Sequence, residues 1–484
     1  MNALHIEVMT KLRILKKLMD SQGEWVSTAE LSKELNMNVS KMRQLLKHFL
    51  DDLEELKVDI RIKIVKQHGI IVENCNYIKY TQIRKLLITS TFEYQLIWNF
   101  FREKIKKSQD FSFNYHISNP TFYRRLNFIN EGLTFYGIKL HKFMIEGNER
   151  FVRSFLIQYF YEVNYGCDFP FKKREKETIL QLIGLMERKM GFNLTNDSKE
   201  RLCYLWMVSK IRRENHHFLD NPLRECSEFC LNNPYFLIFK EVFSPFLSKN
   251  EFMKNEMEYL FYGFFSVHIN YSSLSINHLV TVKKMLENSR CQYKKASKMY
   301  LDSLKEKLLI HLPYTDKKIL QIEIYSSCMY AWLFPIPVSF ELDLNYFDYI
   351  KNISIKYPEF TEYIDLILDR SRTVDPTVLN RQYIIKYIAM IIYCYKNKFS
   401  FKKNIHIAVR LRQGWIQENI ITEQIFSRFK NEYNLEVSVT PEQADILITD
   451  MPNEKNKNGK VLYLYNQMLD LAKLESWLDQ WPFR

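Results

Sequence analysis

Four polar residues near the N-terminus have the spacing of one helix face, at i, i+3, i+4 and i+7. They are Ser40, Arg43, Gln44 and Lys47. The opposite face is apolar and consists of Met42, Leu45 and Phe49. Arginine can donate two hydrogen bonds to a guanine edge and glutamine can bind an adenine edge, whereas Lys41 and Lys47 suit phosphates. The spacing predicts a recognition helix for duplex DNA; the alternative is a solvated helix surface.

The elements around this helix predict a winged helix-turn-helix. An apolar stripe indicates a helix over 4–20, and Ser27 or Thr28 is suited to cap a second helix, with Ser40 as the cap of the third. Residues 59–66 alternate charged and apolar side chains, which predicts a half-buried strand, and 70–72 return after a turn at Gly69. Lys63 and Lys66 of this hairpin are placed to bind flanking phosphates.

The same order recurs in residues 76–150. An apolar stripe near 92–101 predicts a helix, Asn119 is suited to the N-cap of a later one, and Pro120 to its first turn. Residues 135–148 predict a second hairpin, whose Lys139 and Lys142 could also bind phosphates. The outer face of the second recognition helix is predicted to carry Thr121, Arg124 and Arg125. Tyr123 is left open between a DNA-backbone contact and the core.

Length and charge support several domains and a polyanionic partner. A chain of 484 residues is too long for one core, and its net charge is +13. Residues 1–150 hold 24 Lys and Arg against 17 Asp and Glu, an excess of 7. Nucleic acid is therefore the first expected partner, and an acidic membrane surface the second. The start lacks the apolar run of a signal peptide, and no apolar stretch is long enough to span a membrane, so a cytoplasmic location is expected.

The cysteines do not predict a metal site. All 8 cysteines lack CxxC spacing and most lie in apolar helical patterns, which is typical of reduced core thiols. The 11 glycines leave little material for a glycine-rich phosphate loop. We therefore expect no metal, no cofactor and no enzymatic activity.

The rest of the chain divides into a helical part and a mixed tail. Residues from about 150 to 395 have helical periodicity and aromatic-rich helices, with Pro335 and Pro337 expected to break one of them. We expect two helical bundles, 151–280 and 281–398. The tail has the order strand, helix, three strands and helix, which predicts a small open α/β sheet.

By this domain order the chain resembles the Mga/AtxA family of PRD-containing virulence transcription regulators. The resemblance is strongest at 147–163, at 198–206 and in the first helix-turn-helix. It implies a multidomain, mainly α fold with these five parts: winged helix-turn-helix domains at 1–75 and 76–150, PRD (PTS-regulation) bundles at 151–280 and 281–398, and an EIIB-like α/β domain at 404–484. It also implies a homodimer or higher oligomer that binds double-stranded DNA, and the phosphocarrier protein of the sugar phosphotransferase system as a partner.

The resemblance implies phosphohistidines in the bundles, but the chain departs from the pattern. Gly263 and Ile391 stand where such domains typically carry a histidine. The remaining candidates for phosphorylation are His311 in the second bundle and three histidines in the first, His216, His217 and His268; each could equally be a surface or capping histidine.

The tail departs from the family pattern as well. Leu411 occupies the position of the phosphorylated cysteine of EIIB proteins, and a leucine cannot accept phosphate. Arg410 and Arg412 flank it, so the loop could still hold an anion. The tail is then expected to serve self-association. Its tryptophans could form the subunit interface or belong to the core: Trp415, Trp477 and Trp481.

The sequence therefore predicts a DNA-binding regulator of virulence or metabolic genes. We expect a preference for A·T-rich, deformable sites, because few of its side chains are suited to contact base edges. Two alternatives remain: a phosphotransferase-system component, against which the missing cysteine and histidines argue, and an RNA-binding PRD antiterminator, which would begin with a β-rich domain.

Overall fold

The computed structural model describes most of the chain. The described residues are 5–21, 23–66, 68–219, 230, 233–246, 253–271, 274–287, 292–305, 308–309, 312–336, 369, 380–395, 404–430, 433–438, 440–453, 460–464 and 469–479. The chain divides into two compact units, one built of Met1–Met299, Lys318–Leu344 and Thr373–Ile384, the other of Tyr300–Lys317, Asn345–Arg372 and Ile385–Arg484. The five predicted domain boundaries stay predictions.

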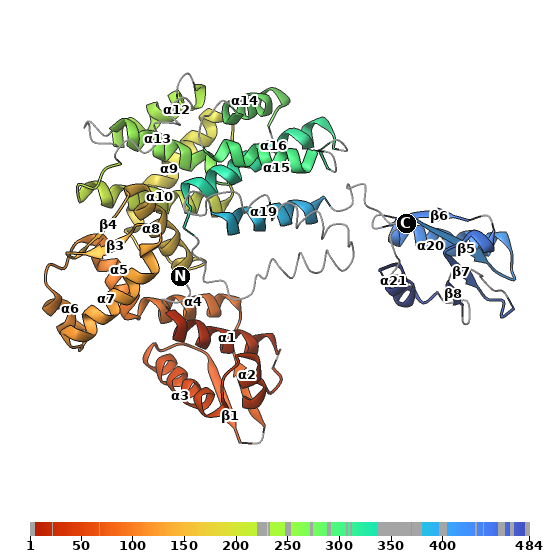
Figure 1. Cartoon of the computed structure of the whole chain (residues 1–484), viewed down its shortest axis with the longest axis horizontal. Helices are drawn as coiled ribbons and strands as arrows, with labels where there is room; N and C mark the ends of the chain where they lie inside the picture. The colour runs from red at the N-terminus through yellow and green to blue at the C-terminus, as the bar shows by residue number, and fades with distance from the viewer. Residues whose placement is uncertain are drawn as a thin grey trace. The chain divides into compact units, whose positions relative to one another are not determined.

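The first module consists of three helices and a hairpin (Figure 1). α1 (Ile6–Asp20) and α3 (Val39–Glu55) pack together with the short α2 (Thr28–Glu34), and β1 (Arg61–Val65) pairs antiparallel with β2 (Gly69–Glu73). Val26 forms a bridge to Ile70 and extends the hairpin by one position. The winged helix-turn-helix order predicted for this region is confirmed by these elements.

Two local predictions for the first module need correction. The side chain of Asn38, not of Ser40, caps α3 by accepting a hydrogen bond from the Lys41 amide. β1 is mostly exposed rather than half-buried, because the apolar face of the hairpin lies on β2, where Ile70 and Val72 are buried. The Ser27 cap of α2 is confirmed, since its hydroxyl accepts from the Glu30 amide at 3.0 Å.

The second module adds a helix to the same plan. α4 (Tyr77–Thr89) and α5 (Phe92–Arg102) precede α6 (Ser108–Asn114), α7 (Asn119–Thr134) and the hairpin of β3 (Lys139–His141) and β4 (Met144–Glu146). The side chain of Ser118, not of Asn119, caps α7. Asn130 bonds both backbone groups of Leu140 and so fixes the hairpin to α7.

Long helices with apolar interfaces form the middle of the chain (Figure 1). α8 (Glu149–Asn164) packs on α10 (Asn196–Glu214), and α9 (Lys173–Met190) packs on α10 and α12 (Pro234–Phe243). α13 (Met253–Ser266) lies against α10 and α12. The other described α-helices of this part are α14 (Ile276–Glu287), α15 (Gln292–Lys305), α16 (Tyr314–Leu333) and α19 (Arg381–Cys394). α16 stops two residues before Pro335, as predicted, and Pro337 lies outside the described residues.

The tail is an α/β domain with a parallel four-stranded sheet in the order β6-β5-β7-β8. Its strands are β5 (Asn404–Arg410), β6 (Asn434–Val437), β7 (Ile446–Thr449) and β8 (Lys460–Tyr463), and its helices are α20 (Trp415–Phe429) and α21 (Leu471–Asp479). Ile405, Ile407 and Val409 of β5 pack with Ile421 and Ile425 of α20 in its main core. The predicted small α/β sheet is confirmed. Among the described helices of the whole chain, none has the length and apolarity needed to cross a membrane.

Candidate nucleic-acid interface

α3 presents the four predicted recognition residues to solvent. Ser40, Arg43, Gln44 and Lys47 are exposed, as is Lys41, whereas the helix buries its opposite face through Met42, Leu45, Leu46, Phe49 and Leu53. The arrangement offers hydrogen-bond donors and positive charge on one accessible face, which is what a helix in the major groove requires.

An ion pair of the buried Lys11 attaches α3 to α1. The Lys11 ammonium lies 2.7 Å from Asp52 of α3 and 2.7 Å from Glu7. Burial opposes the charged form of Lys11, but hydrogen bonds to Asp52 and Glu7 outweigh it and raise the Lys11 pKa above its usual value. The contact holds one end of α3 while leaving its outer face open.

The two lysines of the first hairpin differ in their availability. Lys63 is exposed but lies 2.5 Å from Glu73 on the neighbouring strand, so part of its charge is compensated. Lys66 is exposed in the turn, and no ion pair to it is found among the described residues. Of the two, Lys66 is the freer phosphate ligand.

In the second module the structure separates the predicted residues. Arg124 is exposed and Thr121 is partly exposed. The guanidinium of Arg125 instead lies over Phe92 of α5, 5.0 Å from the ring centroid. It also lies 3.7 Å from the carboxylate of Glu93. Its side chain is still 43% exposed, but the guanidinium is turned toward α5 and its charge is partly compensated by Glu93. Tyr123, which the sequence left open, is 51% exposed and therefore is not core. Lys139 and Lys142 are exposed on the second hairpin.

Polar contacts join the second module to α8 and α10. Arg212 of α10 donates to the Ile145 carbonyl of β4 at 3.1 Å and to Glu149 at 2.6 Å. Arg153 of α8 binds Glu256 of α13 through two hydrogen bonds of 2.7 and 2.8 Å, and both side chains are buried. Burial disfavours the charged form of Arg153, yet Glu256 and Glu149 outweigh this and raise its pKa.

The histidines proposed for phosphorylation lie in different settings. His216 is exposed with a positive φ of 62°. His217 lies 2.5 Å from Glu103, just after α5, and His268 lies 3.6 Å from Glu323 and 3.3 Å from the Tyr383 hydroxyl. His311 lies outside the described residues. An exposed imidazole, which phosphoryl transfer requires, is therefore most fully provided by His216.

Gly263 has no room for a side chain. A β-carbon built at this position would lie 2.1 Å from Cδ2 of the buried Leu205. The histidine that the family resemblance expects here would therefore collide with α10.

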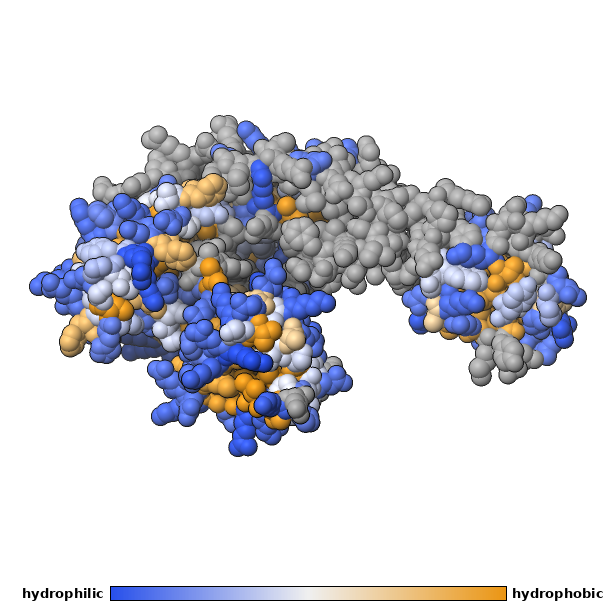
Figure 2. Space-filling model, turned by 60° about the horizontal axis from the view of Figure 1, so that its bottom comes forward, coloured by the Kyte–Doolittle hydropathy of each residue, from blue (hydrophilic) through white to orange (hydrophobic). Residues whose placement is uncertain are grey.

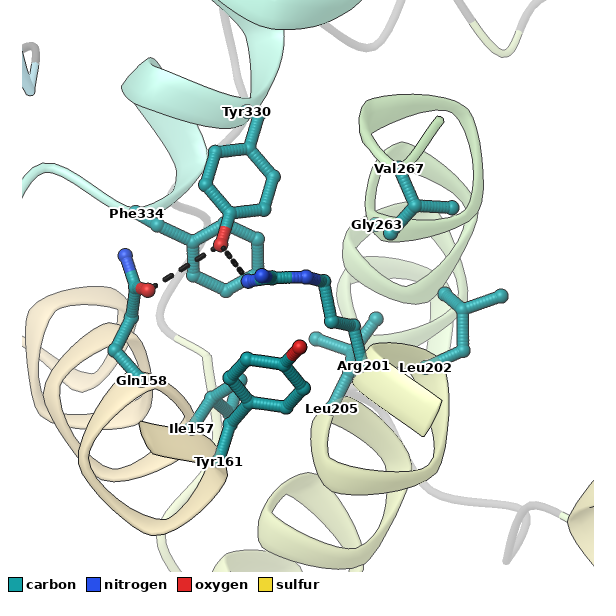
Figure 3. A pocket seen from close by; sticks show the side chains of 10 residues that line it. All are labelled: Ile157, Gln158, Tyr161, Arg201, Leu202, Leu205, Gly263, Val267, Tyr330 and Phe334. Atoms are coloured by element: carbon teal, nitrogen blue, oxygen red, sulfur yellow. Dashed lines mark hydrogen bonds between the residues drawn. The ribbon is translucent and has the colours of Figure 1, made fainter. Parts of the chain in front are cut away.

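Next to Gly263 lies a small, mainly apolar cavity, into which a few polar side chains project (Figure 3). Arg201 donates to Asp197 at 2.8 Å and to the Tyr330 hydroxyl at 2.9 Å, and Tyr330 donates to Gln158 at 3.2 Å. Figure 3 shows the Arg201 guanidinium between Tyr161 and Tyr330. The cavity has a volume of about 10 Å³, roughly the space of one water, so a small-molecule effector does not fit there.

Two backbone donors of the loop before α20 are already bound by carboxylates of the chain. Leu411 is buried, its amide donates to Glu418 at 3.1 Å, and the Arg412 amide donates to Asp450 at 3.0 Å. Arg410 lies 3.7 Å from Glu418. Carboxylates of the chain thus occupy the places where the anion predicted for this loop would bind.

The tryptophans of the tail also differ. Trp415 is 74% exposed, whereas Trp477 packs against the core; Trp481 lies outside the described residues. Figure 2 shows apolar areas among hydrophilic residues both on the helix-turn-helix modules and on the α/β domain.

Comparison with known proteins supports a helix-turn-helix regulator. The family model described as the Mga helix-turn-helix domain matches residues 76–160, which are the second module and most of α8. The chain is 24% identical over 217 residues to the capsule synthesis positive regulator AcpB of Bacillus anthracis, covering 43% of each protein. It is 25% identical over 225 residues to the anthrax toxin expression trans-acting positive regulator of Bacillus anthracis, covering 45% of this chain and 44% of that protein.

The fold and the matched domain define a helix-turn-helix protein whose relatives are named as regulators. Over the matched residues the chain is similar to the Mga/AtxA family of virulence regulators. It spans less than half the length of these relatives.

Proposed function

We propose that this chain binds double-stranded DNA through its two helix-turn-helix modules and regulates transcription. The observation that carries the proposal is the outer face of α3, where Lys41, Arg43, Gln44 and Lys47 are exposed together above a buried apolar face. Lys66 and, across the second module, Arg124, Lys139 and Lys142 add exposed positive charge for phosphates. Relatives named as positive regulators favour activation of the target genes.

Site selection on this account combines base contacts with DNA shape. Arg43 and Gln44 are the base-directed donors of α3, and lysines contact the backbone. With so few base contacts, deformable A·T-rich sequences are favoured because they bend at lower cost.

Self-association through the tail is the second part of the proposal. Trp415, Ile416 and Ile420 are 74%, 70% and 54% exposed on α20. Apolar side chains gathered on one accessible helix face lose water contact when a second copy covers them. The tail would then join two chains, so that their DNA-binding modules act on one site together.

The helical bundles are proposed to transmit a regulatory signal to the modules. Arg212, Glu149 and Ile145 connect α10 to the second hairpin, and His217 contacts Glu103 just after α5. Phosphorylation of His217 would replace that hydrogen bond with repulsion between phosphate and Glu103. His216 is the more accessible acceptor for a phosphocarrier protein.

One binding experiment separates this proposal from its alternatives. The full chain is titrated with duplex DNA fragments and with hairpin RNA at a single salt concentration. Preferential binding of duplex DNA, followed by a defined footprint on genomic DNA, is expected. Tighter binding to hairpin RNA would favour an antiterminator. Phosphoryl transfer from a phosphocarrier through the chain to another protein, without DNA binding, would favour a phosphotransferase component.

A further inference from the structure

The two helix-turn-helix modules match residue by residue at an interval of 80 positions. Asn38 and Ser118 cap the two recognition helices in the same way, each accepting from the amide three residues later. The turns before them contain Asn36 and His116, with φ of 53° and 50°. The pattern of buried, partly buried and exposed residues is identical over 31–40 and 111–120. Residues at this interval therefore occupy equivalent places.

The buried faces of α3 and α7 confirm this alignment. Met42, Phe49 and Leu53 of α3 correspond to the buried Phe122, Ile129 and Leu133 of α7. Arg125 corresponds to Leu45, a buried position, which explains why its guanidinium packs on Phe92 beside Glu93.

The outer faces, by contrast, differ in chemistry. The positions of Arg43, Gln44 and Lys47 are occupied by the exposed Tyr123, Arg124 and Asn127. The first face carries three cations, including Lys41, whereas its counterpart carries Arg124 alone. Asparagine can bind the N6 and N7 atoms of adenine through two hydrogen bonds, and an apolar ring surface can contact the thymine methyl group.

We propose that the second module recognises an A·T base pair in the major groove through Asn127 and Tyr123. The Asn127 amide group donates to adenine N7 and its carbonyl accepts from adenine N6. Tyr123 lies one turn earlier on the same face of α7, close enough for its ring to contact a thymine methyl on the same or a neighbouring pair. The inference rests on the proposed function and names the recognition residues of its second half-site.

Different contributions to salt dependence follow from the two faces. Each cation that neutralises a phosphate steepens the decline of affinity with salt, by roughly 0.9 log units per log unit of salt. Asn127 and Tyr123 are uncharged, so they affect which base pair is chosen and not the salt slope. α3 therefore supplies most of the salt-dependent affinity, and α7 a larger share of the discrimination between bases.

The test is a selection from a pool of random-sequence DNA duplexes, performed with the full-length wild type and with Asn127→Ala, Tyr123→Ala and Arg43→Ala. Asn127→Ala is expected to lose one A·T preference and to bind the wild-type consensus between about 5-fold and 150-fold more weakly. Its salt slope should equal that of the wild type. Arg43→Ala should relax a different position. Asn114→Ala, an exposed asparagine on α6, is the matched control and should enrich the wild-type sequence.

The outcomes distinguish the inference from the proposed function. If Asn127→Ala and Tyr123→Ala enrich the same sequences as the wild type with unchanged affinity, the second module does not recognise bases in this way. If the wild type itself binds no duplex in the pool, the proposed function fails and this inference with it. Unchanged circular dichroism of the variants excludes misfolding as the cause of any loss.

Discussion

Single residues determine how far this chain carries the regulatory chemistry of the family that it resembles. The buried Leu411 stands at the position where EIIB proteins carry a cysteine. Gly263 stands where a PRD histidine is expected, and it lies against Leu205. Both positions are closely packed, and a histidine at position 263 would collide with Leu205.

Substitution of Gly263 tests this packing directly. Gly263→Ala should lower the free energy of unfolding by about 1–3 kcal/mol, because the new methyl group collides with Leu205. Alanine's helix preference offsets only part of that cost. In a Leu205→Ala background most of the cost should disappear. Gly184→Ala on α9 is the control, since its β-carbon meets only Arg188 Nη1 at 3.8 Å, and it should be neutral or stabilising. Equal urea midpoints for both glycine variants would contradict the packing account.

His5 should make folding stability depend on pH. Burial, and secondarily the positive N-terminus, lower its pKa to about 4, and its ring bonds Tyr159 at 3.0 Å and Thr91 at 3.3 Å. Because the unfolded chain takes up the proton near pH 6.5, stability is retained above that pH and is lost as the pH falls toward 4. The loss between pH 7 and pH 5 should be about 2 kcal/mol.

The measurement is chemical unfolding of the wild type and of His5→Asn across this pH range. The difference in unfolding free energy between the wild type and the variant should shrink by that amount between pH 7 and pH 5, because asparagine at position 5 cannot take up a proton. His48→Asn, which changes an exposed histidine, serves as the control. A wild type and a His5→Asn variant with parallel pH profiles would show that His5 does not titrate in the folded chain as inferred.

At the scale of elements, much of the architecture could be predicted because it depends on local patterns. Both hairpins, both recognition helices and the order of the tail follow from periodicity and from turn residues such as Gly69 and Pro120. The cap positions were less predictable, because several neighbouring polar residues can serve as a cap. The actual caps are Asn38, two residues before Ser40, and Ser118, one residue before Asn119.

Arg125 shows why the phase of a helix matters. Spacing alone grouped it with Thr121 and Arg124, one residue out of register with α3. Aligning the two modules on buried positions, Met42 with Phe122 and Leu53 with Leu133, would have matched Arg125 to Leu45, the side that faces α5. The contact of Arg125 with Glu93 and the close approach of Leu205 to Gly263 involve helices that are separate in the sequence. A local sequence pattern therefore cannot predict them.

Removing one partner of the ion pair between α8 and α13 should be strongly destabilising. Arg153→Met leaves the buried Glu256 without its main cation, and should cost about 3–5 kcal/mol. The double variant Arg153→Met/Glu256→Met should recover part of this loss. Lys189→Met breaks an exposed pair with Glu241 and should cost less than about 1 kcal/mol. Thermal or urea unfolding gives the comparison, and a small effect for Arg153→Met would rule out a stabilising network.

The apolar face of α20 should govern self-association. Replacing Trp415 and Ile416 with serine should shift the sedimentation profile toward the monomer, because both side chains are exposed and would be covered only by a second copy. Deleting residues 404–484 should have the same effect. Gln443→Ala, at an exposed position just before β7 and outside α20, is the control. A profile unchanged by the double substitution would remove this face from any interface.

At the scale of the whole molecule, charge and domain order act together. The +13 net charge suits a polyanion, and α3 offers that charge in a form a DNA groove can accept. The α/β tail, which the sequence also predicted, supplies an apolar face in place of a phosphate acceptor. Domain order alone does not show whether the tail can accept phosphate as EIIB proteins do, because that function depends on a single cysteine.

The most direct test measures the dissociation constant for duplex DNA over a range of salt concentrations. The wild type is compared with Arg43→Ala/Lys47→Ala, two exposed positions of α3. The variant should bind more weakly, with a salt slope smaller by about 1–2 and an unchanged circular dichroism spectrum. If the variant keeps the wild-type affinity and slope, α3 is not the DNA-binding element and the central claim is wrong.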